Sequence, residues 1–216
     1  MGKGPKPNEQ RIVLEKISWQ KFESILAEMD ARTSRFTYDR GRLEMMTPLD
    51  EHERCRKLIE SLLLVLAEEL KLPMEGYVAP TLMRPDLGKA VEPDACYYFR
   101  HAAALQGKAA PDLAVDPPPD LVQEVALNKS TLDKLSIYAA LGVPEVWRYL
   151  SQPGEDFWSG ELLIYRLDGD RYIRSRSSLA FSALSAAKVL EFIEQSDSMG
   201  LMTALRLLRA WTQEIR

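Results

Sequence analysis

The chain has 216 residues, of which 46% are hydrophobic and 28% charged, and its formal net charge is −4 at pH 7. This size and composition fit one globular domain with a hydrophobic core, and the acidic balance excludes a broad basic surface for nucleic acid. Two cysteines and two histidines, in no metal-type spacing, argue against a disulfide framework and against a zinc site.

The sequence also bears on location. The opening stretch MGKGPKPNEQ is polar, and the longest apolar run, LLLVLA at 62–67, is too short to cross a bilayer. We therefore expect a soluble cytoplasmic protein with no membrane partner. Residues 1–10 are expected to form a loose tail and residues 11–216 a single domain. A homodimer is an open alternative that the sequence does not decide.

Hydrophobic periodicity and turn residues predict the elements of the chain. In chain order they are a helix over 18–29, two short strands within 35–46, a helix over 49–70, extended segments at 75–83 and 94–99, a loop over 100–118 that can hold a helical turn, a strand over 121–127, a helix over 130–141, a strand over 144–150, a hairpin of 161–166 with 172–175, and helices over 185–195 and 199–214.

Capping residues set the expected helix ends. Ser18 is expected to cap the first helix, and Thr47 with Pro48 to start the second. Ser130 is expected to cap the helix that Gly142 ends. The order of elements predicts an α/β fold with a mixed, partly antiparallel sheet that carries the strands at 76–84, 94–99, 120–127 and 144–150, flanked by the helices at 49–70 and 131–141.

The strand LVQEVAL, at 121–127, contains a carboxylate where an apolar side chain would pack better. Glu124 lies among apolar neighbours whichever face of the strand is buried, and an unpaired buried carboxylate costs several kcal/mol. It persists only with a cation, a metal ion or good hydrogen bonds. Lys134 falls on an apolar side of the next helix, so a strand, a loop and a helix could bring the two together.

A second carboxylate precedes the strand within VEPDACYYF, at 91–99. Asp94, Cys96 and Tyr98 share one face of that strand. An Asp at a strand start, a Glu inside the next strand and a nearby Lys form a recurring constellation for phosphodiester chemistry. Two carboxylates can hold a divalent cation, which polarises a phosphate and lowers the pKa of bound water.

Three stretches carry a family resemblance: GRLEMMTPLDEHE at 41–53, VEPDACYYF at 91–99, and PPDLVQEVALNKSTLDKLSIYAALGVPEVWRY at 118–149. The last has Glu124-Val125, then Lys134 four residues before Tyr138, then Gly-Val and Glu-x-Trp. With this pattern the chain resembles the Uma2 family of restriction-endonuclease-like proteins, which is abundant in cyanobacteria and has a PD-(D/E)XK nuclease fold.

The resemblance implies roles for individual residues. Asp94, Glu124 and Lys134 take the catalytic positions. Asp94 and Glu124, with the backbone carbonyl of Val125, are expected to bind Mg²⁺ or Mn²⁺. Lys134 is expected to orient or activate the attacking water.

Other positions of the family pattern are accessory or differ in this chain. Glu44 and His52 match two further polar positions of the family. The usual Lys position of the family fold is Ala126 here, so the Lys must come from the following helix. Lys129, in the intervening loop, is a rival for that role.

The expected function is metal-dependent endonucleolytic hydrolysis of DNA, with RNA as an open alternative substrate. A non-catalytic interaction protein on a nuclease scaffold is the alternative class, favoured by the acidic charge and by the short 125–133 loop.

Each residue also has an ordinary structural explanation. Glu124 and Lys134 could be a buried ion pair, Glu44 an exposed strand residue and His52 a solvated one. Five aromatic residues are expected to be core: Tyr97, Tyr98, Phe99, Tyr138 and Trp147.

Overall fold

The computed structural model describes residues 10–29, 34–126, 130–151 and 160–215, with only the backbone for residues 51 and 52. The helices are α1 (Trp19–Glu28), α2 (Asp50–Leu70), the 3₁₀ turn η1 (Pro85–Leu87), α3 (Ala102–Leu105), α4 (Lys134–Ala140), α5 (Ala186–Ser198) and α6 (Leu201–Glu214). The strands are β1 (Gln10–Leu14), β2 (Arg35–Asp39), β3 (Arg42–Thr47), β4 (Glu75–Val78), β5 (Leu82–Arg84), β6 (Lys89–Val91), β7 (Ala95–Tyr98), β8 (Leu121–Ala126), β9 (Glu145–Leu150), β10 (Glu161–Asp168) and β11 (Arg171–Ser175).

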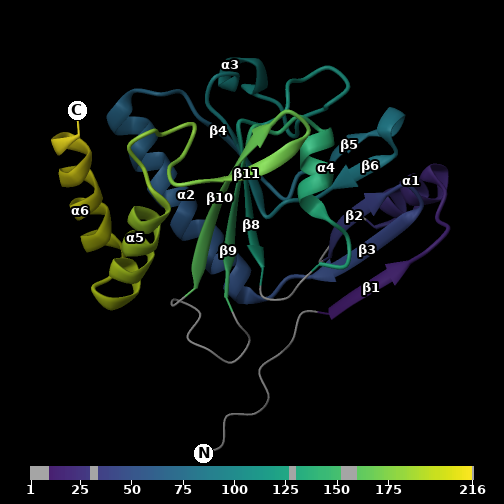
Figure 1. The fold of residues 1–216 in the computed structure, drawn as a ribbon, viewed down its shortest axis with the longest axis horizontal. Helices are drawn as coiled ribbons and strands as arrows, with labels where there is room; N and C mark the ends of the chain where they lie inside the picture. The colour runs from purple at the N-terminus through teal and green to yellow at the C-terminus, as the bar shows by residue number, and fades with distance from the viewer. Residues whose placement is uncertain (1–9, 30–33, 127–129, 152–159, 216) are drawn as a thin grey trace, which may run out of the picture.

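A six-stranded mixed sheet forms the larger part of the fold, in the order β11-β10-β9-β8-β7-β4. Its strands β8 and β9 are parallel, whereas the other neighbours are antiparallel. Helices α2 and α5 cover one face of this sheet, with α6 packed against both of them, and α4 covers the other face (Figure 1). The predicted α/β class, with a mixed sheet flanked by helices, is confirmed.

The alternation of side chains along β8 and β9 explains how both faces are packed. Leu121, Val125 and Trp147 lie in the core that includes α2, α5 and α6. Val122 and Val146 belong to the core under α4. The five aromatic residues expected in the core are all buried. The side chain of Glu124 therefore points to the α4 side, because it alternates with Val125.

A second, five-stranded sheet has the order β1-β3-β2-β6-β5 and packs against α1. Its hairpin of β2 and β3 turns at Gly41, whose φ of 94° suits glycine. Ser18 caps α1 as predicted, because its hydroxyl oxygen accepts a hydrogen bond from the Lys21 N–H at 3.2 Å. Within the described residues, no helix is long and apolar enough to span a membrane.

The predicted strand at 76–84 is wrong as a single element. β4 ends at Val78 in the six-stranded sheet, and β5 begins at Leu82 in the five-stranded sheet. Between them Ala79 has a positive φ of 47° and is followed by Pro80, which has no N–H to donate. The chain therefore leaves one sheet and joins the other within this segment.

Two predicted helix starts are also wrong. Thr47 is the last residue of β3, and the N-cap of α2 is Leu49, whose side chain makes no capping bond. The N-cap of α4 is Asp133 and not Ser130. The hydroxyl of Ser130 donates to the Glu44 carboxylate instead. Both predictions failed because distant partners engage the predicted caps: Thr47 pairs with Gln10 in the sheet, and the Ser130 hydroxyl binds Glu44.

Candidate nuclease active site

Asp94 and Glu124 lie at the end of the ladder between β7 and β8. The antiparallel ladder ends with the pair Ala95 and Gln123, and Asp94 and Glu124 are the residues next to this pair on the two chain segments. The two side chains are buried, with exposed fractions of 3% for Asp94 and 5% for Glu124. Two buried acidic groups thus lie at the same end of the β7–β8 ladder.

Backbone hydrogen bonds fix the segment that carries Asp94. Its carboxylate Oδ2 accepts a hydrogen bond from the Val125 N–H at 2.7 Å. Its backbone carbonyl accepts from the Ala79 N–H at 3.2 Å. Asp94 is therefore tied to β8 through its side chain and to the end of β4 through its main chain.

Lys134 lies directly against Glu124. Its Nζ is 2.9 Å from both Glu124 oxygens, and the exposed fractions of the two side chains are 14% and 6%. Lys134 is the first residue of α4, and Tyr138 lies one helical turn later on the same side. The Tyr138 hydroxyl donates to Glu124 Oε1. Burial, together with the Glu124 charge, raises the pKa of Tyr138 well above its usual value, so the phenol stays protonated and remains a donor.

A second cation, Arg148, stands beside Glu124 on the opposite side from Asp94. The parallel register of β8 and β9 pairs Glu124 with Arg148. Both line a cavity of about 20 Å³ whose other lining residues are Arg11, Met46, Val125, Ala126, Ser130 and Lys134. This volume accommodates about one water molecule. The cavity can hold a water or an ion, whereas a nucleotide would have to approach from outside.

Glu44, on β3, links the five-stranded sheet to this cavity. Its carboxylate accepts hydrogen bonds from Arg11 at 2.8 Å, from the Ser130 hydroxyl at 2.7 Å and from the Thr131 N–H at 2.6 Å. Burial alone would raise the pKa of Glu44, but these donors outweigh it and lower the pKa. With an exposed fraction of 1%, Glu44 is not the exposed strand residue that its sequence allowed. It holds the segment that leads into α4.

The oxygen donors present are chemically suited to a divalent cation. The carboxylates of Asp94 and Glu124 and the carbonyl of Val125 are hard donors of the kind that Mg²⁺ and Mn²⁺ prefer. Among the described side chains, no three His, Cys, Asp or Glu residues gather into a metal cluster. The donor set therefore fits an ion with few protein ligands and several waters. Such an ion would bind the same Glu124 carboxylate that contacts the Lys134 ammonium.

The Glu-x-Trp motif has a structural function in this fold. The Glu145 carboxylate accepts hydrogen bonds from Trp147 Nε1 at 2.6 Å and from the N–H groups of Leu179 and Ala180 at 2.9 and 3.1 Å. Burial raises the pKa of Glu145 although these donors oppose the shift. Glu145 and Trp147 thus anchor the 178–180 loop and lie outside the candidate site.

The structure places Lys134 against Glu124, and Asp94 against the main chain of the next residue, Val125. Lys129 and the side chain of His52 lie outside the described part of the chain, so their expected roles stay predictions. The sequence reasoning missed Arg11 and Arg148. Arg148 could have been suspected as the charged residue of the otherwise apolar strand VWRYL, whereas Arg11 gave no signal.

The chain is an α/β protein with two sheets flanked by helices. The model of the Uma2 family, described as "Putative restriction endonuclease", matches residues 19–196, and the chain belongs to this family. A comparison with curated proteins gave no match.

A solved structure has the same fold. It is described as "a putative nuclease belonging to DUF820" and comes from Anabaena variabilis ATCC 29413. It matches with a TM-score of 0.50 and 13% sequence identity, and the alignment covers 78% of this chain and 96% of that one. At this identity the likeness establishes the fold only.

Proposed function

We propose that this protein is a metal-dependent endonuclease that hydrolyses phosphodiester bonds of DNA. The observation that carries the proposal is a pair of buried carboxylates at one end of the β7–β8 ladder. Asp94 accepts a hydrogen bond from the Val125 N–H, and the Lys134 ammonium is 2.9 Å from Glu124. Burying ionisable groups is costly for a fold and is common at functional sites. Membership of the Uma2 family supports the nuclease class.

Each residue of the site has a proposed role. Asp94, Glu124 and the Val125 carbonyl would hold Mg²⁺ or Mn²⁺. The ion would polarise the phosphate of the substrate and lower the pKa of a bound water. Lys134 orients the attacking water and offsets negative charge in the transition state. Tyr138 fixes the Glu124 carboxylate by donating a hydrogen bond to it. Lys134 also limits the repulsion between the carboxylates before a metal ion binds.

Two arginines at the cavity are proposed to bind the phosphate that is cleaved. Arg148 lies beside Glu124 on β9, and Arg11 reaches the same cavity from β1. Within the described residues, the Arg148 side chain makes no ion pair or hydrogen bond. A guanidinium can bind two phosphate oxygens at once, and a local cationic group can attract DNA to an otherwise acidic protein.

Cleavage of plasmid and single-stranded DNA with Mg²⁺ or Mn²⁺ tests the proposal. We expect Asp94→Asn and Glu124→Gln to lower the rate by on the order of a hundredfold or more, as loss of a charged catalytic group does. Glu161→Gln, at an exposed position on β10, is the matched control and should cleave like the wild type. Equal cleavage by all four proteins would indicate a contaminant or another site. The same assay with RNA decides the substrate class.

The choice of lysine needs its own comparison. Lys134→Ala should lower the cleavage rate far more than the affinity for Mn²⁺, because Lys134 acts on water and phosphate rather than as a metal ligand. Lys129→Ala should change neither quantity. Loss of cleavage in Lys129→Ala alone would assign the catalytic role to Lys129.

A non-catalytic scaffold is the second candidate, favoured by the state of Glu124. Both of its oxygens already accept hydrogen bonds from Lys134, and Tyr138 donates to one of them. A carboxylate so well satisfied can persist as structure alone. Calorimetric titration with Mn²⁺ separates the candidates. Binding that Asp94→Asn weakens supports the nuclease, and a folded protein that binds no Mn²⁺ at millimolar concentration supports the scaffold.

A further inference from the structure

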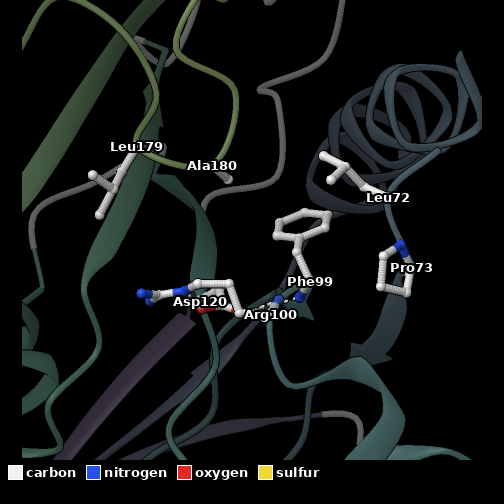
Figure 2. Close-up of a pocket in the computed structure, with 7 residues that line it drawn as sticks. All are labelled: Leu72, Pro73, Phe99, Arg100, Asp120, Leu179 and Ala180. Atoms are coloured by element: carbon white, nitrogen blue, oxygen red, sulfur yellow. Dashed lines mark hydrogen bonds and ion pairs between the residues drawn. The ribbon is translucent and has the colours of Figure 1, made fainter. Parts of the chain in front are cut away.

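A larger cavity, of about 400 Å³, lies at the other end of the strands that carry the candidate active site. Its lining residues are Leu72, Pro73, Phe99, Arg100, Asp120, Leu179 and Ala180 (Figure 2). Phe99 and Arg100 follow the end of β7, and Asp120 precedes the start of β8. Asp120 and Glu124 are four residues apart, which is roughly 13 Å along a strand. The cavity is therefore separate from the site of Asp94 and Glu124.

Two buried carboxylates hold the walls of this cavity in place. Asp120, with an exposed fraction of 5%, accepts hydrogen bonds from the N–H groups of Phe99 and Arg100 at 2.8 and 2.9 Å. Glu145 holds the N–H groups of Leu179 and Ala180 on the facing wall. Because both walls are fixed by buried groups, the cavity is formed before any ligand arrives, which lowers the entropic cost of binding.

The remaining walls are apolar. Figure 2 shows the Phe99 ring between Leu72 and Pro73 on one side and Leu179 and Ala180 on the other. Leu72 and Leu179 are exposed by 37% and 49%, so two large apolar side chains border the opening. A volume of this size falls within the range of pockets that bind small organic molecules. An apolar ligand would cover surface that now faces water.

One cationic group is oriented at the edge of this apolar space. The Nε of Arg100 donates to Asp120 Oδ1 at 2.7 Å, which sets the direction of the guanidinium. In the described parts of the chain, its two terminal nitrogens donate to no other residue, and the side chain is 66% exposed. The free edge of a guanidinium matches the two oxygens of a carboxylate. The pocket thus combines apolar walls with one carboxylate-binding edge.

We propose that this pocket binds a small apolar molecule bearing a carboxylate, with its apolar body against Phe99, Leu72 and Leu179 and its carboxylate on Arg100. The proposal is independent of the nuclease activity. A ligand with one charge fits better than a polyanion, because Arg100 is the only cationic residue among the described residues that line the pocket, and Asp120 stands beside it.

Phenylbutyrate and its neutral analogue phenylbutanol test the proposal in metal-free buffer, by calorimetry or by NMR. We expect the wild type to bind phenylbutyrate at least about tenfold more tightly than phenylbutanol, as a charge-assisted hydrogen bond provides. Arg100→Gln should remove this preference and leave the binding of phenylbutanol unchanged. Arg171→Gln, at an exposed position on the β10–β11 hairpin, should bind both probes like the wild type.

A second variant tests the same pocket independently, in case Arg100→Gln disturbs the contact with Asp120. Leu179 is half-exposed, so Leu179→Glu should fold normally and place a negative charge at the opening. It should weaken the binding of phenylbutyrate more than that of phenylbutanol. Equal affinity of the wild type for the two probes would overturn the proposal. So would absence of binding at millimolar concentration, or an Arg100→Gln protein that keeps the preference for the acid.

Discussion

Removal of the Lys134 ammonium should destabilise the protein strongly, because it leaves a buried carboxylate without its cation. The change considered is Lys134→Met, which keeps most of the apolar stem and removes the charge. Lys134 contacts both Glu124 oxygens at 2.9 Å, and only 14% of its side chain and 6% of that of Glu124 are exposed. Breaking a fully buried pair by removing one partner typically costs about 3–5 kcal/mol.

Two features of the site reduce that cost. Tyr138 still donates to Glu124, and Arg148 lies beside it on β9. The partial exposure of Lys134 also admits some solvent. We therefore expect the free energy of unfolding to fall by about 2–3 kcal/mol in Lys134→Met. For a chain of this length each kcal/mol lowers the Tm by about 2–4 °C.

Urea unfolding at pH 7, followed by tryptophan fluorescence, measures the change, since Trp147 is buried. The double variant Lys134→Met/Glu124→Gln should recover at least half of the loss, because the uncompensated charge is gone. Lys188→Met, which breaks an exposed helical pair with Glu191, is the control and should cost at most about 1 kcal/mol. A loss in Lys134→Met no larger than that of the control, or a double variant as unstable as the single one, would refute the reasoning.

Three further predictions follow from buried groups. The pKa of Glu44 is lowered in the fold from its usual 4.5, so its contribution to stability is present above that pH and is lost as the pH falls through the lowered value. Urea unfolding from pH 7 to pH 3 should therefore show a stability gap between wild type and Glu44→Gln that closes in acid, and a gap independent of pH would contradict this. Tyr138→Phe should lower the free energy of unfolding by about 1–3 kcal/mol, since Glu124 loses a hydrogen-bond donor. The same urea unfolding measures this change, and a stability equal to that of the wild type would contradict the prediction. Burial raises the pKa of the thiols of Cys55 and Cys96, so a thiol-specific chromogenic reagent should find no reactive thiol in the folded protein and two after denaturation, whereas rapid reaction of the native protein would show that a thiol is accessible.

The contact of Glu124 with Lys134 could be predicted because each is a charged residue at an apolar position of its own element. A Glu inside an apolar strand and a Lys on the apolar side of the next helix each require a partner. Only one short loop separates them, so few arrangements are possible. The contact of Asp94 with β8 is different, because it depends on the register between strands joined across the segment at 100–118. Strand periodicity gives the face of a residue but not its cross-strand neighbour.

The two arginines and Glu44 depend on contacts between distant segments. Arg148 reaches Glu124 only because β8 and β9 pair in parallel, which no local signal specifies. Glu44 is buried because Arg11, from a strand at the start of the chain, and the segment at 130–131 converge on it. The caps predicted at Thr47 and Ser130 failed for the same reason. Local propensity was overridden by partners far away in the sequence.

The exchange of the chain between the two sheets affects how the protein unfolds. β4 and β7 are neighbours in the six-stranded sheet, yet the chain between them contributes β5 and β6 to the five-stranded sheet. A cut at any one point of the chain would therefore not separate the two sheets. Along the chain, β4 of the larger sheet lies between strands of the smaller sheet, and β5 and β6 of the smaller sheet lie between strands of the larger sheet. Loosening of the five-stranded sheet should reach Asp94 directly, because Asp94 is the residue at which the chain returns. Cooperativity between the sheets is thus built into the order of the strands, and partial unfolding of the smaller sheet should disable the candidate site before the larger sheet melts.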